Sequence, residues 1–164
     1  MGLMLAGGQS LIPVYPISQK LILCIDDDPA ILSYEKALLE RSRYSVITAA
    51  SAQQGLGLVT MYTFDAVLLD YEMPGMNGCD VAAEIKRVRP ELAVILLSGS
   101  EVPTYALAMV DAFIPKLEAS RALLPAIAAL CTGIRYPRQK QEGFSHSRSR
   151  QNDETSDKPG DLQR

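Results

Sequence analysis

Acidic residues follow two strongly apolar stretches of this chain, at the point where each stretch ends. Asp26 and Asp27 come directly after the run 21–25, and Asp70 closes the run that begins at residue 66. A continuous apolar run of this length is typical of a strand buried on both faces of a parallel sheet. Ligand sites of such sheets lie just beyond the carboxyl ends of the strands, so we expect the three carboxylates to lie close together.

Three clustered carboxylates require a positive charge. Two unit charges about 4 Å apart repel by about 4 kcal/mol at an effective dielectric constant near 20. Mg²⁺ suits the cluster, because it prefers hard oxygen ligands and takes only a few of them from the protein. Two further predicted strand ends supply Ser98 and Lys116. A carboxylate beside a divalent cation, a lysine and a small hydroxyl can attack phosphorus while the cations neutralise charge on the phosphoryl oxygens.

The elements that would position these residues are readable from the pattern of the chain. Asp28 followed by Pro29 predicts a helix start, because Asp is a good N-cap and proline suits the first helical position. The predicted strands are 20–25, 45–49, 65–69, 93–97 and 112–115, and the predicted helices are 29–43, 52–61, 81–88, 103–110 and 119–132. Five βα units with short connections imply an α/β fold with a parallel sheet covered by helices on both faces.

Composition narrows the class of protein. The chain has 164 residues, 48% of them hydrophobic, and a net charge of −3, which gives no general attraction to nucleic acid or anionic membranes. The three cysteines, Cys24, Cys79 and Cys131, are odd in number and form no C-x-x-C pair. This argues against a disulfide framework or a zinc site and favours a reduced, cytoplasmic compartment.

The two ends of the chain differ from its centre. Residues 1–19 carry no Lys or Arg, and glycines and prolines interrupt their apolar residues, so we expect a flexible extension rather than a signal peptide or membrane span. From residue 133 onward we expect a disordered polar tail, because its few apolar residues show no period. The tail contains the only histidine, His146, for which a ligand role is not expected. It carries seven basic and five acidic residues, which favours a solvated linker over weak nucleic-acid binding.

Four segments taken in order resemble the response-regulator receiver domains of two-component signalling. They are CIDDDP, LLDYEMPGMNG, LLSGS and FIPK, and each contains one of the predicted strand ends. The resemblance covers residues 20–132 and implies a flavodoxin-like, doubly wound sheet with strand order 2-1-3-4-5. It also implies a histidine kinase or phosphotransfer protein as phosphoryl donor and Mg²⁺ as cofactor.

The same resemblance assigns roles by position. Asp70 would be the phosphoacceptor. Asp27 would bind Mg²⁺ directly, Asp26 mainly through water, and the backbone carbonyl of Glu72 would be a further ligand. The phosphoryl-binding residues would be Ser98 and Lys116, and the switch residues Ser98 and Phe113, with Phe113 near the surface of the fifth strand.

Simpler roles are open for several of these residues. Asp28 is expected to be a helix cap rather than a ligand, and Phe113 would otherwise be plain core packing. Ser98 would otherwise be a turn residue, Lys116 a solvated lysine and Asp70 an ordinary loop acid.

The chain departs from the family pattern in three places. Leu117 follows Lys116 where the family usually has proline after a cis bond, and a non-proline cis bond costs about 2.5–4 kcal/mol. Ser98 and Lys116 are a few residues closer than expected, which shortens the fourth helix and puts its usual docking face in doubt. Glu72 stands at the mouth of the site, where we expect its carboxylate to influence how water reaches an acyl phosphate.

Three functions follow from these residues. The first is a stand-alone receiver, not an enzyme, acting through protein contacts, phosphorelay or a phosphate sink, because no DNA-binding segment is evident after Thr132. The second is a receiver-like scaffold that no longer switches by phosphorylation. The third is a metal-dependent phosphatase with Asp70 as nucleophile, for which a second acid suited to proton donation is missing. The kinase, the downstream partner and the oligomeric state are left open.

Overall fold

A computed structural model describes residues 19–134 and 136. Most of the predicted N-terminal extension and polar tail, including His146, lies outside the described residues. Within the described part the strands are β1 (Leu21–Ile25), β2 (Ser45–Ala49), β3 (Ala66–Asp70), β4 (Ala93–Ser98) and β5 (Ala112–Pro115). The helices are α1 (Pro29–Arg41), α2 (Ala52–Met61), α3 (Gly78–Val88), α4 (Thr104–Leu107), the 3₁₀ turn η1 (Lys116–Glu118) and α5 (Ala119–Cys131).

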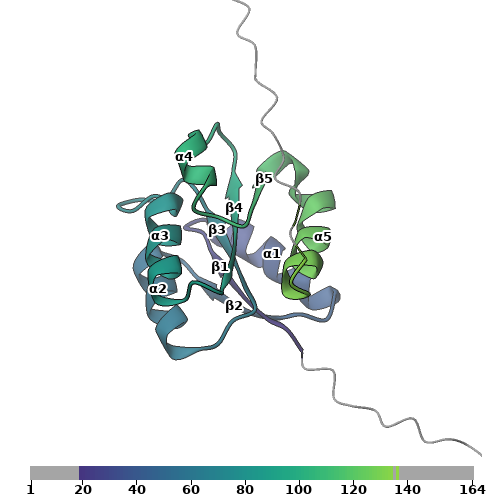
Figure 1. Cartoon of the computed structure of the whole chain (residues 1–164). Helices are drawn as coiled ribbons and strands as arrows, with labels where there is room; N and C mark the ends of the chain where they lie inside the picture. The colour runs from purple at the N-terminus through teal and green to yellow at the C-terminus, as the bar shows by residue number, and fades with distance from the viewer. Residues whose placement is uncertain (1–18, 135, 137–164) are drawn as a thin grey trace, which may run out of the picture.

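The five strands form one parallel sheet in the order β2-β1-β3-β4-β5, which confirms the predicted fold. Helices α2 and α3 cover one face and α1 and α5 cover the other (Figure 1). Because all strands run the same way, their carboxyl ends meet at one edge. The register puts Asp70 of β3 beside Leu97 of β4, and Ser98 beside Pro115 of β5.

Local signals explain where the helices begin. The Asp28 side chain accepts hydrogen bonds from the backbone N–H groups of Ala30 and Ile31, so its predicted role as the cap of α1 is confirmed. Ser51 caps α2 in the same way. Helix α3 begins three residues earlier than predicted, because Asn77 accepts hydrogen bonds from two N–H groups of its first turn.

The core has two layers, one on each side of the sheet. Strand residues that face α2, α3 and α4 form the first layer, and those that face α1 and α5 form the second. Cys24 is buried in the second layer, as its place in an apolar run predicts. Tyr136, beyond the end of α5, also packs against this layer.

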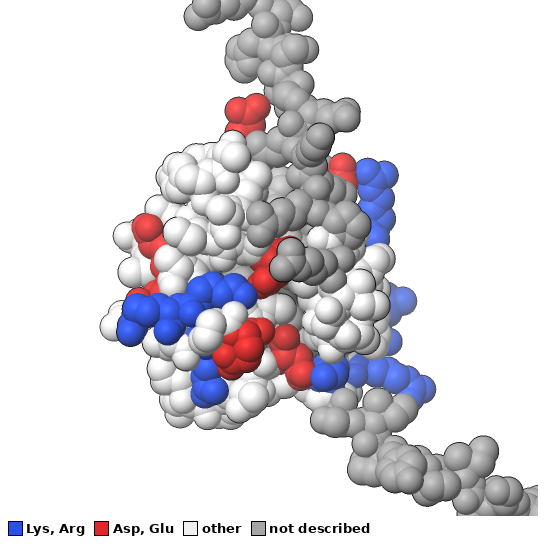
Figure 2. Space-filling view, viewed as in Figure 1, with Lys and Arg blue, Asp and Glu red and all other residues white. Residues whose placement is uncertain are grey.

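The charge distribution on the surface and the length of the helices bear on possible contacts with nucleic acid and membranes. Among the described residues, acidic and basic side chains are interspersed on the face seen in Figure 2. None of the helices in the described part of the chain is both long and apolar enough to cross a membrane.

Candidate functional site

The three predicted acids come together at the carboxyl edge of the sheet. One carboxylate oxygen from each of Asp26, Asp27 and Asp70 lies within 4.8 Å of the others. Asp70 is the last residue of β3 rather than the first residue after it, and its side chain is 3% exposed. Asp26 is 2% exposed, whereas Asp27 is open to solvent. The cluster therefore has a buried floor and one exposed acid at its mouth.

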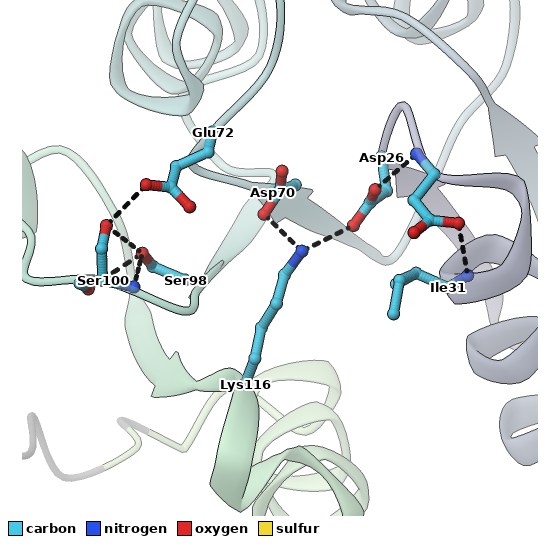
Figure 3. Close-up of polar contacts among 8 residues, drawn as sticks. Asp26, Ile31, Asp70, Glu72, Ser98, Ser100 and Lys116 are labelled. Carbon is cyan, nitrogen blue, oxygen red and sulfur yellow. Dashed lines mark hydrogen bonds and ion pairs between the residues drawn. The ribbon is translucent and has the colours of Figure 1, made fainter.

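Lys116 supplies the counter-charge that such a cluster needs. Its Nζ lies 3.0 Å from Oδ2 of Asp26 and 2.8 Å from Oδ1 of Asp70, between the two acids (Figure 3). Burial alone would lower the pKa of Lys116, but its contacts with Asp70 and Asp26 outweigh burial and raise that pKa above its usual value. The alternative of a solvated surface lysine is wrong, and the ammonium stays charged over the physiological range.

The missing proline after Lys116 does not displace the lysine. No cis peptide bond occurs in the described part of the chain, so the Lys116–Leu117 bond is trans. Lys116 is the first residue of η1 and reaches both acids from there, while the Leu117 side chain is 98% exposed.

The oxygens of the cluster fit a hard divalent cation. Oδ1 of Asp70 is buried and has no hydrogen-bond partner among the described residues, because Lys116 approaches it as an ion pair without hydrogen-bond geometry. Both oxygens of Asp26 are occupied, Oδ1 by the Asp28 N–H at 2.8 Å and Oδ2 by Lys116. Asp27 is accessible to an incoming ion. Mg²⁺ would find carboxylate ligands here and would keep several of its waters.

Burial also affects the phosphoacceptor candidate itself. The pKa of Asp70 is raised, first by burial and then by the negative charge of Asp26, while Lys116 acts in the opposite direction. A cation at the cluster would oppose this rise, because it favours the ionised form of the carboxyl group.

Ser98 is turned toward the following loop in this state. Its buried hydroxyl donates to the backbone oxygen of Ser100 at 2.9 Å and accepts from the Ser100 N–H at 3.0 Å. The Ser100 hydroxyl donates in turn to Oε1 of Glu72 at 2.8 Å (Figure 3). The Glu72 carboxylate is thereby held at the mouth of the site, and the expected serine–phosphoryl contact would require the Ser98 hydroxyl to rotate.

Two expectations about the β5 side of the site need correction. Phe113 was expected near the surface, but it is 7% exposed and belongs to the core layer formed with α2, α3 and α4. Its large ring fits the apolar space under the short α4 helix, so plain core packing describes Phe113 in this state. Helix α4 covers only Thr104–Leu107 instead of 103–110, and Tyr105 and Met109 around it are exposed.

Sequence reasoning missed two residues near the cluster. Ser100 belongs to the quoted LLSGS segment but was given no role, because its contact with Glu72 spans 28 positions. Glu35 is buried on α1, although the type of residue suggests an exposed position. Its spacing from Leu32 and Leu39, at i+3 and i−4, was the available signal, since it places Glu35 in the apolar stripe.

Gly78 fixes the loop that follows Asp70. A Cβ atom at this position would collide with the backbone oxygen of Asp70 and would lie 2.8 Å from Cα of Tyr71. Because both are backbone atoms, the loop would have to move. We expect Gly78→Ala to lower the free energy of unfolding by about 1–3 kcal/mol, the usual cost of overpacking, as measured by urea denaturation.

Gly57→Ala is the matched control for Gly78→Ala. Gly57 lies in α2, and nothing would lie within 4 Å of its added Cβ. This change should stabilise the protein by up to about 1 kcal/mol through helix propensity. Equal effects of the two substitutions would contradict the assigned role of Gly78.

Comparisons with known proteins agree with the fold and the site. The family model described as the response regulator receiver domain matches residues 22–127. The transcriptional regulatory protein GlrR of Escherichia coli K12 is 37% identical over 78 residues, which are 48% of this chain and 18% of that protein. The cell cycle response regulator CtrA of Brucella ovis is 30% identical over 78 residues, 48% of this chain and 34% of that protein.

Solved structures match over a larger share of the chain. A CheY-like receiver domain protein from Methanospirillum hungatei has a TM-score of 0.67 and 31% identity, and the match covers 71% of this chain and 96% of that one. The response regulator TrrA of Thermotoga maritima, solved in complex with Mg(2+)-BeF, has a TM-score of 0.65 and 29% identity, covering 68% and 99%.

The curated relatives are much longer than the matched region, so they bear on the domain and not on the activity of a whole protein. The family match covers more than half of the chain and includes every candidate site residue. The chain therefore belongs to the response regulator receiver domain family of two-component signal transduction, a family of signalling phosphoacceptor domains rather than enzymes.

Proposed function

We propose that Asp70 accepts a phosphoryl group from a phosphohistidine on a histidine kinase or phosphotransfer protein. A carboxylate oxygen of Asp70 attacks phosphorus, a P–O bond forms, the P–N bond to the donor imidazole breaks, and the imidazole takes up a proton. The observation that carries the proposal is the buried Oδ1 of Asp70, which lacks a hydrogen-bond partner in the described structure and lies 2.8 Å from a charged lysine.

Each neighbour of Asp70 has a task in this step. Asp27 would bind Mg²⁺ directly and Asp26 through water, since both Asp26 oxygens already accept hydrogen bonds. The backbone carbonyl of Glu72 would be a further ligand. Mg²⁺ would neutralise charge on the phosphoryl oxygens. Lys116 would pair with another phosphoryl oxygen, and its ion pair with Asp26 would then weaken.

The remaining residues would report the phosphorylated state. Ser98 would leave Ser100 and donate its hydroxyl to a phosphoryl oxygen, and Phe113 would adjust its packing beneath α4. A bias of a few kcal/mol between two such states is enough to change the affinity for a partner. We propose that the output is a protein contact or a phosphorelay step in a reduced compartment, where the described cysteines stay free.

The proposal is tested by locating the phosphoryl group. Purified protein is incubated with acetyl phosphate in the presence of Mg²⁺ or of a chelator, and the modified residue is mapped by peptide mass spectrometry. We expect modification of Asp70 that needs the divalent ion. Labelling that is unchanged by the chelator, or a modified residue outside the acidic cluster, would overturn the proposal. Phosphotransfer profiling against histidine kinases would then identify the donor.

The short α4 helix favours one alternative, a receiver-like scaffold that no longer switches. Helix α4 has four residues, and Ser98 is held by its own loop. Binding of Mg²⁺ with no measurable phosphorylation by acetyl phosphate or by any kinase would favour the scaffold. The phosphatase alternative lacks support, because the Glu72 carboxylate is bound to Ser100 and is not placed as a proton donor to a leaving group.

Glu72 should set the lifetime of an acyl phosphate on Asp70. Its carboxylate accepts a hydrogen bond from Ser100 on the side of Asp70 opposite Asp26 (Figure 3), and we expect it to restrict the approach of water from that side. We expect Glu72→Ala to speed dephosphorylation severalfold, as measured by loss of label after the phosphoryl donor is removed. Glu72→Gln keeps the length of the side chain and an acceptor for Ser100, so it should decay at nearly the wild-type rate. Identical decay of the wild type and the alanine variant would refute this role.

A further inference from the structure

Glu35 is a buried acid for which the phosphoryl-transfer proposal has no task. It lies on the inner face of α1 and is 5% exposed. Leu32 and Leu39, one turn away on either side, belong to the apolar layer between the sheet and α5. The residues of α5 that enter this layer include Ala122 and Leu123, which carry no charge. A glutamate in this layer therefore faces an apolar surrounding on two sides.

No cation of the described residues is paired with this buried carboxyl group. None of the ion pairs formed by the described residues includes Glu35. The polar group that acts on it from β1 is the thiol of Cys24, which favours the ionised form of the carboxyl group and so lowers its pKa. Carboxylates are seldom buried without a charged partner, because desolvation of the ionised form is costly.

The charged groups that act on Glu35 through space are Asp26 and Asp70 of the acidic cluster and Lys116 beside it. Burial raises its pKa from 4.5 to about 7, and the negative charge of Asp26 adds to this rise, as does Asp70 more weakly. Lys116 and the Cys24 thiol lower the pKa of Glu35 in opposition to burial. A carboxyl group with a pKa of about 7 gains or loses its proton near neutral pH, so a change in the charge of the cluster would change the protonation of Glu35.

We propose that Glu35 is a fourth acid of the site, which holds a proton while the cluster lacks a cation and releases it to solvent when a divalent cation binds. This inference rests on the proposed function, since the cation is the one that phosphorylation requires. When the cation binds, the neutral carboxylic acid of Glu35 becomes a carboxylate and one proton passes to solvent. Glu35 is thus a positioning residue: it tunes the cluster without touching the ion.

Linkage makes the effect reciprocal. If a divalent cation at the three acids lowers the pKa of Glu35, then deprotonation of Glu35 must strengthen cation binding by the same factor. Each unit by which that pKa falls corresponds to about tenfold in affinity between the fully protonated and fully ionised forms. Mg²⁺ affinity should therefore rise with pH near neutrality by more than the three aspartates alone would produce.

The test counts protons released on Mg²⁺ binding. Isothermal titration calorimetry at pH 7, in two buffers with different ionisation enthalpies, gives the number of protons per bound ion. A group with a pKa of about 7 is half protonated at that pH, so we expect Glu35 to contribute up to about half a proton in the wild type. Glu35→Gln, which keeps the length of the side chain but cannot release a proton, should lose this contribution. Glu40→Gln, an exposed change on the same helix, should keep it.

Each outcome decides between the two proposals. Absence of Mg²⁺ binding in the wild type would overturn the proposed function. Binding with equal proton release in the wild type and Glu35→Gln would overturn only the role of Glu35. A second measurement needs no variant: the ¹³C signal of the Glu35 carboxyl group, followed by NMR against pH with and without Mg²⁺, should show a lower pKa with the ion. An unchanged titration would likewise refute the inference.

Discussion

Asp70→Asn is expected to abolish phosphorylation of this protein. The amide has nearly the shape of the carboxylate but offers no charged nucleophile, and loss of a covalent nucleophile costs on the order of 1,000-fold or more in rate. Asp26 is also buried beside Lys116, but both of its oxygens already accept hydrogen bonds, whereas Oδ1 of Asp70 accepts none among the described residues. Labelling by acetyl phosphate with Mg²⁺ measures the effect.

Asp28→Asn is the matched control for Asp70→Asn. Asp28 also follows β1, but its carboxylate caps α1 by accepting the N–H groups of Ala30 and Ile31. Asparagine caps helices about as well as aspartate, so this variant should fold and be phosphorylated like the wild type. Persistent labelling of Asp70→Asn would mean that another residue is the acceptor. Loss of labelling in Asp28→Asn would mean that labelling depends on negative charge near β1 and does not identify the nucleophile.

The parts of the fold that follow local rules were predictable. Ser51 and the residues after it gave α2 its bounds, and Asp28 with Pro29 gave the start of α1, because caps and proline act within a few residues. The β3 strand was predicted one residue too early. Asp70 continues the ladder because it pairs in register with Leu97 of β4, and no property of an isolated aspartate predicts this.

The candidate site divides in the same way. The acids and Lys116 were predictable because parallel strands deliver their carboxyl ends to one edge, whatever the details of packing. The contact of Ser100 with Glu72 was not, since it depends on how two loops 28 positions apart meet. The burial of Phe113 depends on its packing in the core layer shared with α2, α3 and α4, which is likewise a tertiary effect.

Glu35 should make the folded protein less stable as the pH rises. Its pKa is about 7 in the folded state and about 4.5 ordinarily, so between these values the folded chain holds a proton that the unfolded chain has lost. The free energy of unfolding therefore falls as the pH increases through this window. A difference of about 2.5 units corresponds to about 3 kcal/mol, a large share of the stability of an ordinary domain.

Glu35→Met should remove this loss of stability. Methionine has a similar length and suits the apolar layer that Leu32 and Leu39 occupy, and a buried charge replaced by an apolar side chain is often stabilising. In urea denaturation with a chelator present, we expect the variant to exceed the wild type by up to about 3 kcal/mol at pH 8 and by much less at pH 5.

The exposed Glu40→Met change on the same helix should leave the pH dependence as it is in the wild type. Parallel stability curves for the wild type and Glu35→Met would mean that the buried carboxyl does not titrate in this window. Saturating Mg²⁺ should narrow the gap at pH 8, because the ion offsets the repulsion from Asp26 and Asp70 that the ionised Glu35 feels. If Mg²⁺ leaves this difference in the free energy of unfolding unchanged, the ionisation of Glu35 is not coupled to the acidic cluster.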